Sequence, residues 1–463
     1  MEYNIPRLII AATHSGAGKT TMVTGLIAAL RERGLKVKGY KVGPDYIDPT
    51  YHTLAAGSPT HNLDTWLMPP ATLRRLFATE NQGADIAIIE GVMGLYDGGL
   101  KGVSSTAEIA KLLHAPILLV LDVKSMGASA AAVALGFCNY DPEVNIAGVL
   151  LNRVGSLSHA AMIREALASL PVKLPIYGIL SRNEELTLPE RHLGLIPTAE
   201  MADEAVKVLD RLTAAVEARV NIEAVLKLAR SAPLFVEETP PPVAAHDGEK
   251  VRIAVAQDEA FSFYYPSSLK VLASLGAEII PFSPLHDTFL PEADGLILGG
   301  GFPEMYAKRL FRNTAMRVSI ESAAFFGMPV YAECGGFMYL MDSMRDFTGE
   351  SFPMTGVITG VAQMNKKLQT VGYVTATMER DTVLGKKGAV LRGHEFHFST
   401  EQAVGIEYPR AYSVTKMRTG EKYLAGYAEG NVLGSYLHIH FAGCPEAAAC
   451  FVEKCREYKR GQG

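Results

Sequence analysis

The segment 12–21, Ala-Thr-His-Ser-Gly-Ala-Gly-Lys-Thr-Thr, constrains the fold of this 463-residue chain more than any other feature. It lies between an apolar run at 8–11 and a helical pattern over 19–33, which Gly34 ends. Glycines at such a strand-to-helix turn let backbone N–H groups approach a polyphosphate at the start of the helix. We therefore expect a parallel α/β sheet with a phosphate site at its edge.

The loop departs from the usual phosphate-loop pattern at one position. Gly-x-x-x-x-Gly-Lys-(Ser/Thr) places a glycine at position 13, where this chain has Thr13. Lys19 is expected to neutralise the β- and γ-phosphates, and the Thr20 hydroxyl to ligate Mg²⁺. A glycine-rich turn that binds nothing is disfavoured, because strand, turn, Lys-Thr and amphipathic helix occur in register. The residues expected to bind the nucleotide are Ser15, Gly16, Ala17, Gly18, Lys19, Thr20 and Thr21.

The remaining pattern predicts two domains. Apolar runs at 37–40, 86–89, 117–120 and 147–151 alternate with helical patterns, which is typical of a doubly wound parallel sheet. The pattern breaks over 231–250, where three consecutive prolines and a polar stretch are typical of a linker. A second α/β series starts at 251, and alternating runs over 354–436 predict added antiparallel strands. We expect two α/β, doubly wound domains, at 1–232 and 250–463, joined by a linker at 233–249.

Composition excludes several classes of protein. The chain has 44 Lys and Arg against 49 Asp and Glu, a net charge of −5, which argues against a general electrostatic hold on nucleic acid or anionic membrane. Its five cysteines match neither a disulfide framework nor zinc spacing, as expected in a reducing cytoplasm. No signal peptide is visible, and the apolar runs are well short of the roughly 18 residues of a membrane span. We expect a cytoplasmic protein with no nucleic-acid or membrane partner, and the oligomeric state stays open, a homodimer being one option.

Two acidic segments follow predicted strands, at the carboxyl ends where open α/β sheets build their sites. Lys-Val-Gly-Pro-Asp-Tyr-Ile-Asp-Pro occupies 41–49, and Glu-Gly-Val-Met-Gly-Leu-Tyr-Asp-Gly occupies 90–98. Asp45 and Glu90 are the expected Mg²⁺ ligands, directly or through water. Taken singly, each acid is more often a solvated loop residue or a helix cap. Asn152, just past the run 147–151, suits either recognition of an adenine edge or a simple turn.

Cys334 lies at a predicted sharp strand-to-helix turn, which is typical of a nucleophile elbow. A free cysteine is usually a small buried side chain. Here the glycines that flank it and the upstream run 299–301 favour a nucleophile with an oxyanion hole, for which the candidates are Gly300, Gly301 and Gly335.

A histidine base is expected downstream of Cys334. His438 and His440 are both candidates, and strand alternation would put both on one face. The sequence Gly-His-Glu-Phe-His at 393–397 lacks the spacing of a helical metal motif. Its His394 and His397 are expected to be polar strand residues near a domain interface.

Together these motifs resemble the cobyrinate a,c-diamide synthase family, in which a P-loop amidoligase is fused to a class I glutamine amidotransferase domain. The N-terminal part is similar to dethiobiotin synthetase-like enzymes, because 13–15 lacks the second lysine of the partitioning ATPases. The resemblance implies ATP- and Mg²⁺-dependent amidation of the a and c acetate carboxylates of cobyrinate, a tetrapyrrole, through acyl phosphates. The same chemistry on Ni-sirohydrochlorin or sirohaem remains an alternative, as does, in another class, a P-loop switch ATPase.

The resemblance also implies roles for individual residues. Cys334 and His438 would hydrolyse L-glutamine, because His438 holds the place of the family histidine. Many amidotransferases carry a glutamate two residues after this histidine, where this chain has His440. The resemblance therefore implies a Cys-His dyad or an orienting residue from elsewhere. The residues expected to face the tetrapyrrole are Lys41, Tyr46, Asp48 and Asp97.

Overall fold

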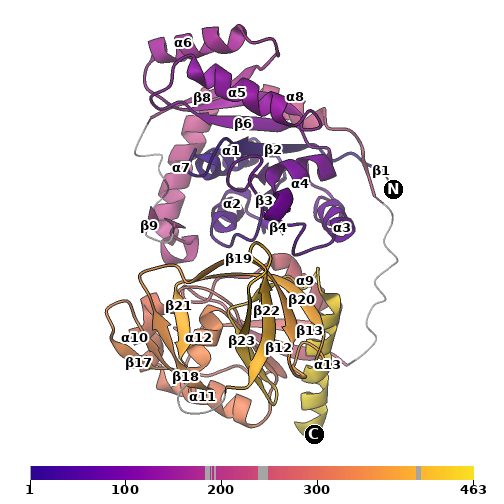
Figure 1. Cartoon of the computed structure of the whole chain (residues 1–463), viewed down its shortest axis with the longest axis vertical. Helices are drawn as coiled ribbons and strands as arrows, with labels where there is room; N and C mark the ends of the chain where they lie inside the picture. Colours follow the sequence, from indigo (N-terminus) through magenta and orange to yellow (C-terminus); the bar gives the residue numbers. More distant parts are fainter. Residues whose placement is uncertain are drawn as a thin grey trace. The chain divides into compact units, whose positions relative to one another are not determined.

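The computed structural model of the chain describes residues 2–182, 188, 190–191, 194–237, 249–402 and 408–462. The chain divides into two compact units, Met1–Thr65 with Pro69–Pro240, and Trp66–Met68 with Pro241–Gly463. Each unit is built on its own sheet with helices packed against it (Figure 1). The predicted α/β class is confirmed for both.

The first unit has a seven-stranded sheet in the order β4-β3-β5-β2-β6-β7-β8, and every pair in it is parallel. The inner strands are mostly apolar, as is typical of strands that are covered on both faces. β2 lies at the centre, so the loop that follows it opens at the middle of the carboxyl edge. The strands are β2 (Arg7–Ala12), β3 (Val37–Val42), β4 (His61–Leu63), β5 (Ile86–Glu90), β6 (Ile117–Asp122), β7 (Ile146–Val154) and β8 (Ile176–Ser181).

Two apolar cores hold the helices of the first unit against this sheet. One core combines side chains of α1, α7 and α8 with one face of the strands, and the other combines α3, α4, α5 and α6 with the opposite face. This is the doubly wound arrangement that the sequence predicts. The helices are α1 (Lys19–Glu32), α2 (Asp48–Ala56), α3 (Pro70–Glu80), α4 (Thr106–Leu113), α5 (Ser129–Tyr140), α6 (Leu157–Ala168), α7 (Ala202–Arg219) and α8 (Ile222–Arg230).

Short strand pairs complete the first unit. β1 (Glu2–Tyr3) pairs antiparallel with β11 (Phe235–Val236), so ordered structure continues past residue 232, where the linker was expected to begin. Residues 238–248 of the predicted linker lie outside the described residues. A second small pair joins β9 (Glu190–Arg191) and β10 (Gly194–Leu195).

The second unit has a ten-stranded sheet in the order β13-β12-β14-β15-β24-β23-β22-β19-β20-β25. The first five of these strands are parallel, and the rest add antiparallel strands, as predicted for the last third of the chain. The strands are β12 (Val251–Ala256), β13 (Ala277–Phe282), β14 (Gly295–Leu298), β15 (Val330–Glu333), β19 (Thr370–Met378), β20 (Val390–His397), β22 (Arg410–Lys416), β23 (Lys422–Glu429), β24 (Val432–Ser435) and β25 (His438–Ile439).

A four-stranded sheet and five helices complete the second unit. The smaller sheet has the order β17-β16-β18-β21, from β16 (Met341–Arg345), β17 (Ser351–Pro353), β18 (Ile358–Met364) and β21 (Ser399–Gln402). The helices are α9 (Pro266–Ser274), α10 (Ala307–Arg312), α11 (Thr314–Phe325), α12 (Gly335–Leu340) and α13 (Pro445–Gln462). Cys334 lies directly between β15 and α12.

Candidate active sites

The phosphate loop joins the central strand β2 to α1, whose first residue is Lys19. Gly16 and Gly18 have φ angles of 77° and 95°, in the region where only glycine is unstrained. Gly18 is also crowded, because a Cβ there would lie 2.2 Å from Nδ2 of Asn152. That amide donates a hydrogen bond of 2.9 Å to the Ala17 carbonyl, so it braces the loop from β7.

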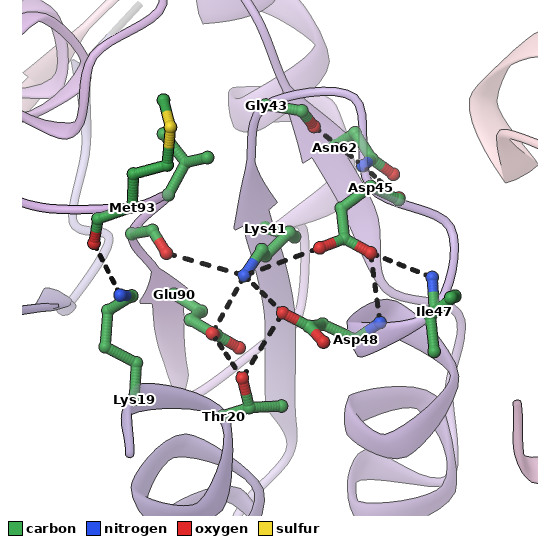
Figure 2. Close-up of polar contacts among 12 residues, drawn as sticks. Lys19, Thr20, Lys41, Gly43, Asp45, Ile47, Asp48, Asn62, Glu90 and Met93 are labelled. Carbon is green, nitrogen blue, oxygen red and sulfur yellow. Dashed lines mark hydrogen bonds and ion pairs between the residues drawn. The ribbon is translucent and has the colours of Figure 1, made fainter. Parts of the chain in front are cut away.

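Lys19 is buried, and its ammonium is held by backbone carbonyls. Nζ donates to the Met93 carbonyl at 2.5 Å and lies 3.4 Å from the His14 carbonyl (Figure 2). Burial lowers the pKa of Lys19 to about 8, although the nearby Glu90 carboxylate acts in the opposite sense. An incoming polyphosphate would supply the negative charge that this ammonium lacks.

A cluster of charged side chains lies beside Lys19. The Thr20 hydroxyl is 2.8 Å from Oε1 of Glu90 and 3.2 Å from Oδ2 of Asp48. Nζ of Lys41 lies between the same two carboxylates, 2.8 Å from Glu90 and 2.5 Å from Asp48 (Figure 2). The end of β3, the end of β5 and the starts of α1 and α2 thus deliver one side chain each to a common point.

Charge compensation keeps Glu90 and Lys41 ionised although both are buried. Burial alone would raise the pKa of Glu90, but Lys41 and His52 outweigh it and hold that pKa well below its usual range. Burial likewise disfavours the ammonium of Lys41, yet Asp48 and Glu90 raise its pKa. Burial, followed by the neighbouring Asp45 carboxylate, raises the pKa of Asp48 well above its usual range. Asp48 is therefore the acid whose charge depends most on an added cation.

Asp45 contacts the first turn of α2 and Lys41. Its Oδ1 accepts the backbone N–H groups of Ile47 and Asp48 at 2.8 and 3.1 Å, and its Oδ2 is 3.7 Å from Nζ of Lys41. The spacing Asp-x-x-Asp at the start of α2 makes the first acid hold the turn and leaves the second to face the loop. Asp48, which was expected to face the substrate, lies beside Thr20, and Asp45, an expected Mg²⁺ ligand directly or through water, lines the same cavity.

Thr20, Asp48 and Glu90 are the side chains that could hold a hard cation. Their hydroxyl and carboxylate oxygens are the donor type that Mg²⁺ prefers, and two carboxylates are as many as it usually takes from a protein. Among the described residues, no group of three or more His, Cys, Asp or Glu side chains is arranged to bind a metal by itself. The donor set fits an ion that completes its shell with water and phosphate oxygens.

The cluster and the loop line a cavity of about 650 Å³. Three basic side chains that the motifs did not predict add positive charge to its wall, namely Lys124, Arg153 and Arg182. The predicted residues in this wall are Ser15, Gly16, Gly18, Lys19, Thr20, Thr21, Lys41, Asp45, Asp48, Glu90 and Asn152.

Three of the predicted residues are not among the described residues that line the cavity. Ala17 is buried under the loop and Tyr46 is also buried. Oδ2 of Asp97 accepts the backbone N–H of Gly94 at 3.0 Å, so it supports the loop after β5. For Asn152 both interpretations remain, because it lines the cavity while its amide oxygen accepts the backbone N–H of Arg153 at 2.9 Å.

In the second unit, Cys334 has the strained backbone of a nucleophile elbow. Its φ of 46° and ψ of −101° form the sharp turn between β15 and α12. Its backbone N–H donates to the Ser435 carbonyl at 2.7 Å. A Cβ at Gly336 would lie 2.1 Å from the Leu298 carbonyl oxygen, so the turn requires glycine there.

The triple-glycine loop after β14 packs against the elbow and against His438. A Cβ at Gly300 would lie 2.8 Å from Cε1 of His438, and one at Gly301 would lie 2.0 Å from the Ala260 carbonyl oxygen. A Cβ at Gly335 would lie 3.1 Å from the Gly301 nitrogen. The three glycines proposed for the oxyanion hole thus meet beside Cys334, with no room for larger residues.

His438 is the histidine that contacts Cys334, the candidate nucleophile. It is buried and hydrogen-bonded to the Cys334 thiol, and its Nδ1 is 3.1 Å from Oε2 of Glu333. Burial opposes its protonation, but these two partners outweigh burial and raise the pKa of His438 to about 10. Glu333 was not singled out from the sequence, although a carboxylate at the end of an apolar strand and next to the nucleophile was a usable signal.

His440 does not share the position of His438. His440 follows the last residue of β25 (His438–Ile439), so it is not a residue of the strand that carries His438. Nε2 of His440 is 3.2 Å from the Ser267 hydroxyl, and its Nδ1 accepts the Ala442 backbone N–H at 3.2 Å. His440 therefore holds together the chain segments around it.

The Gly-His-Glu-Phe-His segment lies in β20, beside β25. His394 is buried, and its ring is stacked on His438 with 4.9 Å between centroids and 15° between planes. His397 stacks on Tyr436 at 3.9 Å. The prediction that both are strand residues is confirmed, and strand pairing places His394 directly opposite the candidate base.

Two family models match the chain. Residues 8–196 match the CobQ/CobB/MinD/ParA nucleotide binding domain, and residues 252–445 match the CobB/CobQ-like glutamine amidotransferase domain. Among the helices of the described ranges, none has the length and apolar character to span a membrane.

Similar proteins match over almost the whole length. A cobyrinate a,c-diamide synthase from Dehalococcoides mccartyi is 45% identical over 97% of this chain and 98% of its own. A hydrogenobyrinate a,c-diamide synthase from Streptomyces coelicolor is 43% identical over 98% of both chains. A cobyrinate a,c-diamide synthase from Caldanaerobacter subterraneus subsp. tengcongensis is 42% identical over 98% of this chain and 99% of its own.

The phosphate loop yields a prediction about nucleotide binding. Gly18→Ala should weaken binding at least about tenfold more than Gly16→Ala, because only position 18 combines a positive φ with a displaced Asn152 amide. The affinity for a fluorescent ATP analogue measures both, and circular dichroism checks that both variants fold. Equal losses would show that the contact with Asn152 does not matter.

Proposed function

This chain belongs to the cobyrinate a,c-diamide synthase family, and we propose that its two units divide one glutamine-dependent ligase reaction between them. The family's activity is the amidation of the a and c acetate carboxylates of cobyrinate, in cobalamin biosynthesis. In our proposal the first unit binds ATP and the tetrapyrrole, and the second unit releases ammonia from glutamine. The observation that carries the proposal is the match to both domain models and to full-length relatives in one chain.

The first unit would activate a carboxylate that ammonia cannot attack directly. A substrate carboxylate oxygen attacks the γ-phosphorus of ATP, ADP leaves, and an acyl phosphate forms. Ammonia then attacks the acyl carbon. The bond between that carbon and the phosphate oxygen breaks, inorganic phosphate leaves, and the nitrogen loses a proton to give the amide. Lys19 would neutralise the transferred phosphoryl group, and Lys41 would bind the substrate carboxylate or the phosphoryl oxygens; both line the cavity, which supports these roles.

We propose that Thr20, Asp48 and Glu90 hold Mg²⁺ with the nucleotide, Asp45 supporting Asp48 through the turn. When bound, the ion would neutralise charge on the triphosphate during phosphoryl transfer. The ion pair of Lys41 with Glu90 and Asp48 sets the orientation of both carboxylates beforehand. Asp97 and Tyr46 would act on the site indirectly, Asp97 by holding the loop after β5.

In the second unit, Cys334 would attack the side-chain amide carbon of glutamine. The thiol proton passes to His438, which then gives it to the departing nitrogen, so ammonia leaves and a γ-glutamyl thioester remains. Water then attacks the thioester with His438 as the base, and glutamate leaves. We propose that the glycines at 300, 301 and 335 line the oxyanion hole for both tetrahedral intermediates.

Hydrogenobyrinate is a second candidate substrate, because a 43% identical relative bears that name. Steady-state rates with cobyrinate and hydrogenobyrinate, each with saturating ATP and glutamine, test the choice. Mass spectrometry of the products should show two added amide groups on the preferred substrate. ATP hydrolysis that needs neither tetrapyrrole nor ammonia would instead favour a switch ATPase.

The division of labour predicts opposite behaviour for two variants. Cys334→Ala should lose glutamine-dependent synthesis and keep ammonia-dependent synthesis, because its role ends when ammonia is released. In Glu90→Gln the rate of synthesis should fall at least about 100-fold with either nitrogen source, because Glu90 acts on the phosphoryl transfer. Product formation with glutamine and with ammonium chloride measures both variants. Near-normal ammonia-dependent synthesis in Glu90→Gln would remove Glu90 from the proposed site.

The two histidines provide a second prediction. His438→Ala should lose glutaminase activity about as completely as Cys334→Ala, since a nucleophile and its base fail as a unit. His440→Ala should keep substantial activity, because its ring is hydrogen-bonded to Ser267 and to the Ala442 backbone. Glutamate release measures both variants, and an inactive His440→Ala beside an active His438→Ala would reverse the assignment.

A further inference from the structure

The base of the glutaminase site has a partner that comes from an unexpected place in the chain. The second position after His438 is His440, whose ring is engaged by Ser267 and the Ala442 backbone. The carboxylate beside His438 is that of Glu333, whose Oε2 lies 3.1 Å from Nδ1 of His438. Glu333 is the last residue of β15 and the direct neighbour of Cys334.

The carboxylate of Glu333 is itself fixed from two sides. Its Oε1 accepts a short hydrogen bond from the Tyr331 hydroxyl and another, of 3.3 Å, from the Ile439 backbone N–H. Tyr331 and Glu333 are two residues apart on β15, so strand alternation puts both side chains on one face. Glu333 thus has one oxygen occupied by donors of the scaffold and the other directed at His438.

We propose that Glu333 is the positioning residue of the glutaminase site, holding His438 with its Nδ1–H toward the carboxylate and its Nε2 toward Cys334. This inference rests on the proposed function of the second unit. The carboxylate selects the tautomer in which Nε2 can accept the thiol proton, and it stabilises the imidazolium that results. When His438 gives that proton to the departing ammonia, it returns to the same tautomer.

The remaining neighbours of His438 do not offer the same help. His394 stacks on the ring, and burial lowers its pKa well below the usual value, so it provides a neutral surface. His397 is stacked on Tyr436, and burial lowers its pKa to about 4. Glu395, also on β20, accepts a hydrogen bond from the Tyr423 hydroxyl. Glu333 is therefore the carboxylate placed to hold His438.

The test compares three variants in the full-length enzyme. Glu333→Gln keeps the size of the side chain and removes its charge, and we expect the glutaminase kcat to fall about 100-fold or more with little change in the KM for glutamine. Tyr331→Phe removes one donor to the carboxylate and keeps the charge, so a loss of only a few fold is expected. Glu395→Gln makes the same substitution at another buried carboxylate and should stay within about threefold of the parent.

Two further readouts separate positioning from folding. Ammonia-dependent synthesis should be unchanged in Glu333→Gln, since the first unit is intact. Iodoacetamide should alkylate Cys334 about tenfold more slowly at pH 7 in this variant, because an imidazole that is no longer oriented by the carboxylate is a poorer acceptor of the thiol proton. A near-parental kcat in Glu333→Gln, an equal loss in Glu395→Gln, or an equal loss of ammonia-dependent synthesis would overturn the proposal. If Glu333→Gln lost glutamine-dependent synthesis while Cys334→Ala kept it, the proposed function would be refuted instead.

Discussion

A buried carboxylate at the last residue of a central parallel strand organises each of the two sites. Glu90 ends β5 in the first unit, and Glu333 ends β15 in the second. A buried charge is tolerated only with an opposite charge and hydrogen bonds around it. Each carboxylate therefore fixes the groups that compensate it, and those groups carry the chemistry proposed for the site.

The compensation differs between the sites in a way that suits their tasks. Glu90 is held by Lys41 and His52, and it leaves an oxygen beside the Thr20 hydroxyl, where phosphate chemistry needs hard oxygen donors. Glu333 faces the imidazole of His438, which in our proposal gains and loses a proton in each turnover. Removing one partner of such a buried pair typically costs about 3–5 kcal/mol of folding stability, so these residues also support the fold.

Local sequence patterns were sufficient for the fold and for the residues that turns present. The loop before Lys19, the strand Ile86–Glu90 and the elbow at Cys334 each follow from a short run of neighbours. The different contacts of Asp45 and Asp48 depend on which of the two carboxylates binds the backbone N–H groups at the start of α2. The pairing of Glu333 with His438, 105 residues apart, depends on the register of the whole sheet. A single sequence carries only a weak signal for such a contact. Here that signal is a charged residue, Glu333, at the end of an apolar strand.

The charge state of His438 tests this account most directly. NMR of the enzyme with ¹⁵N-labelled histidine rings reports whether both ring nitrogens carry protons. With its pKa raised to about 10 by Cys334 and Glu333 against the effect of burial, His438 should be an imidazolium at pH 8 in the glutamine-free enzyme, and its pKa should fall once Glu333 is replaced by glutamine. A neutral His438 in the parent enzyme at pH 8 would contradict the claim that the buried carboxylate sets the chemistry of its site.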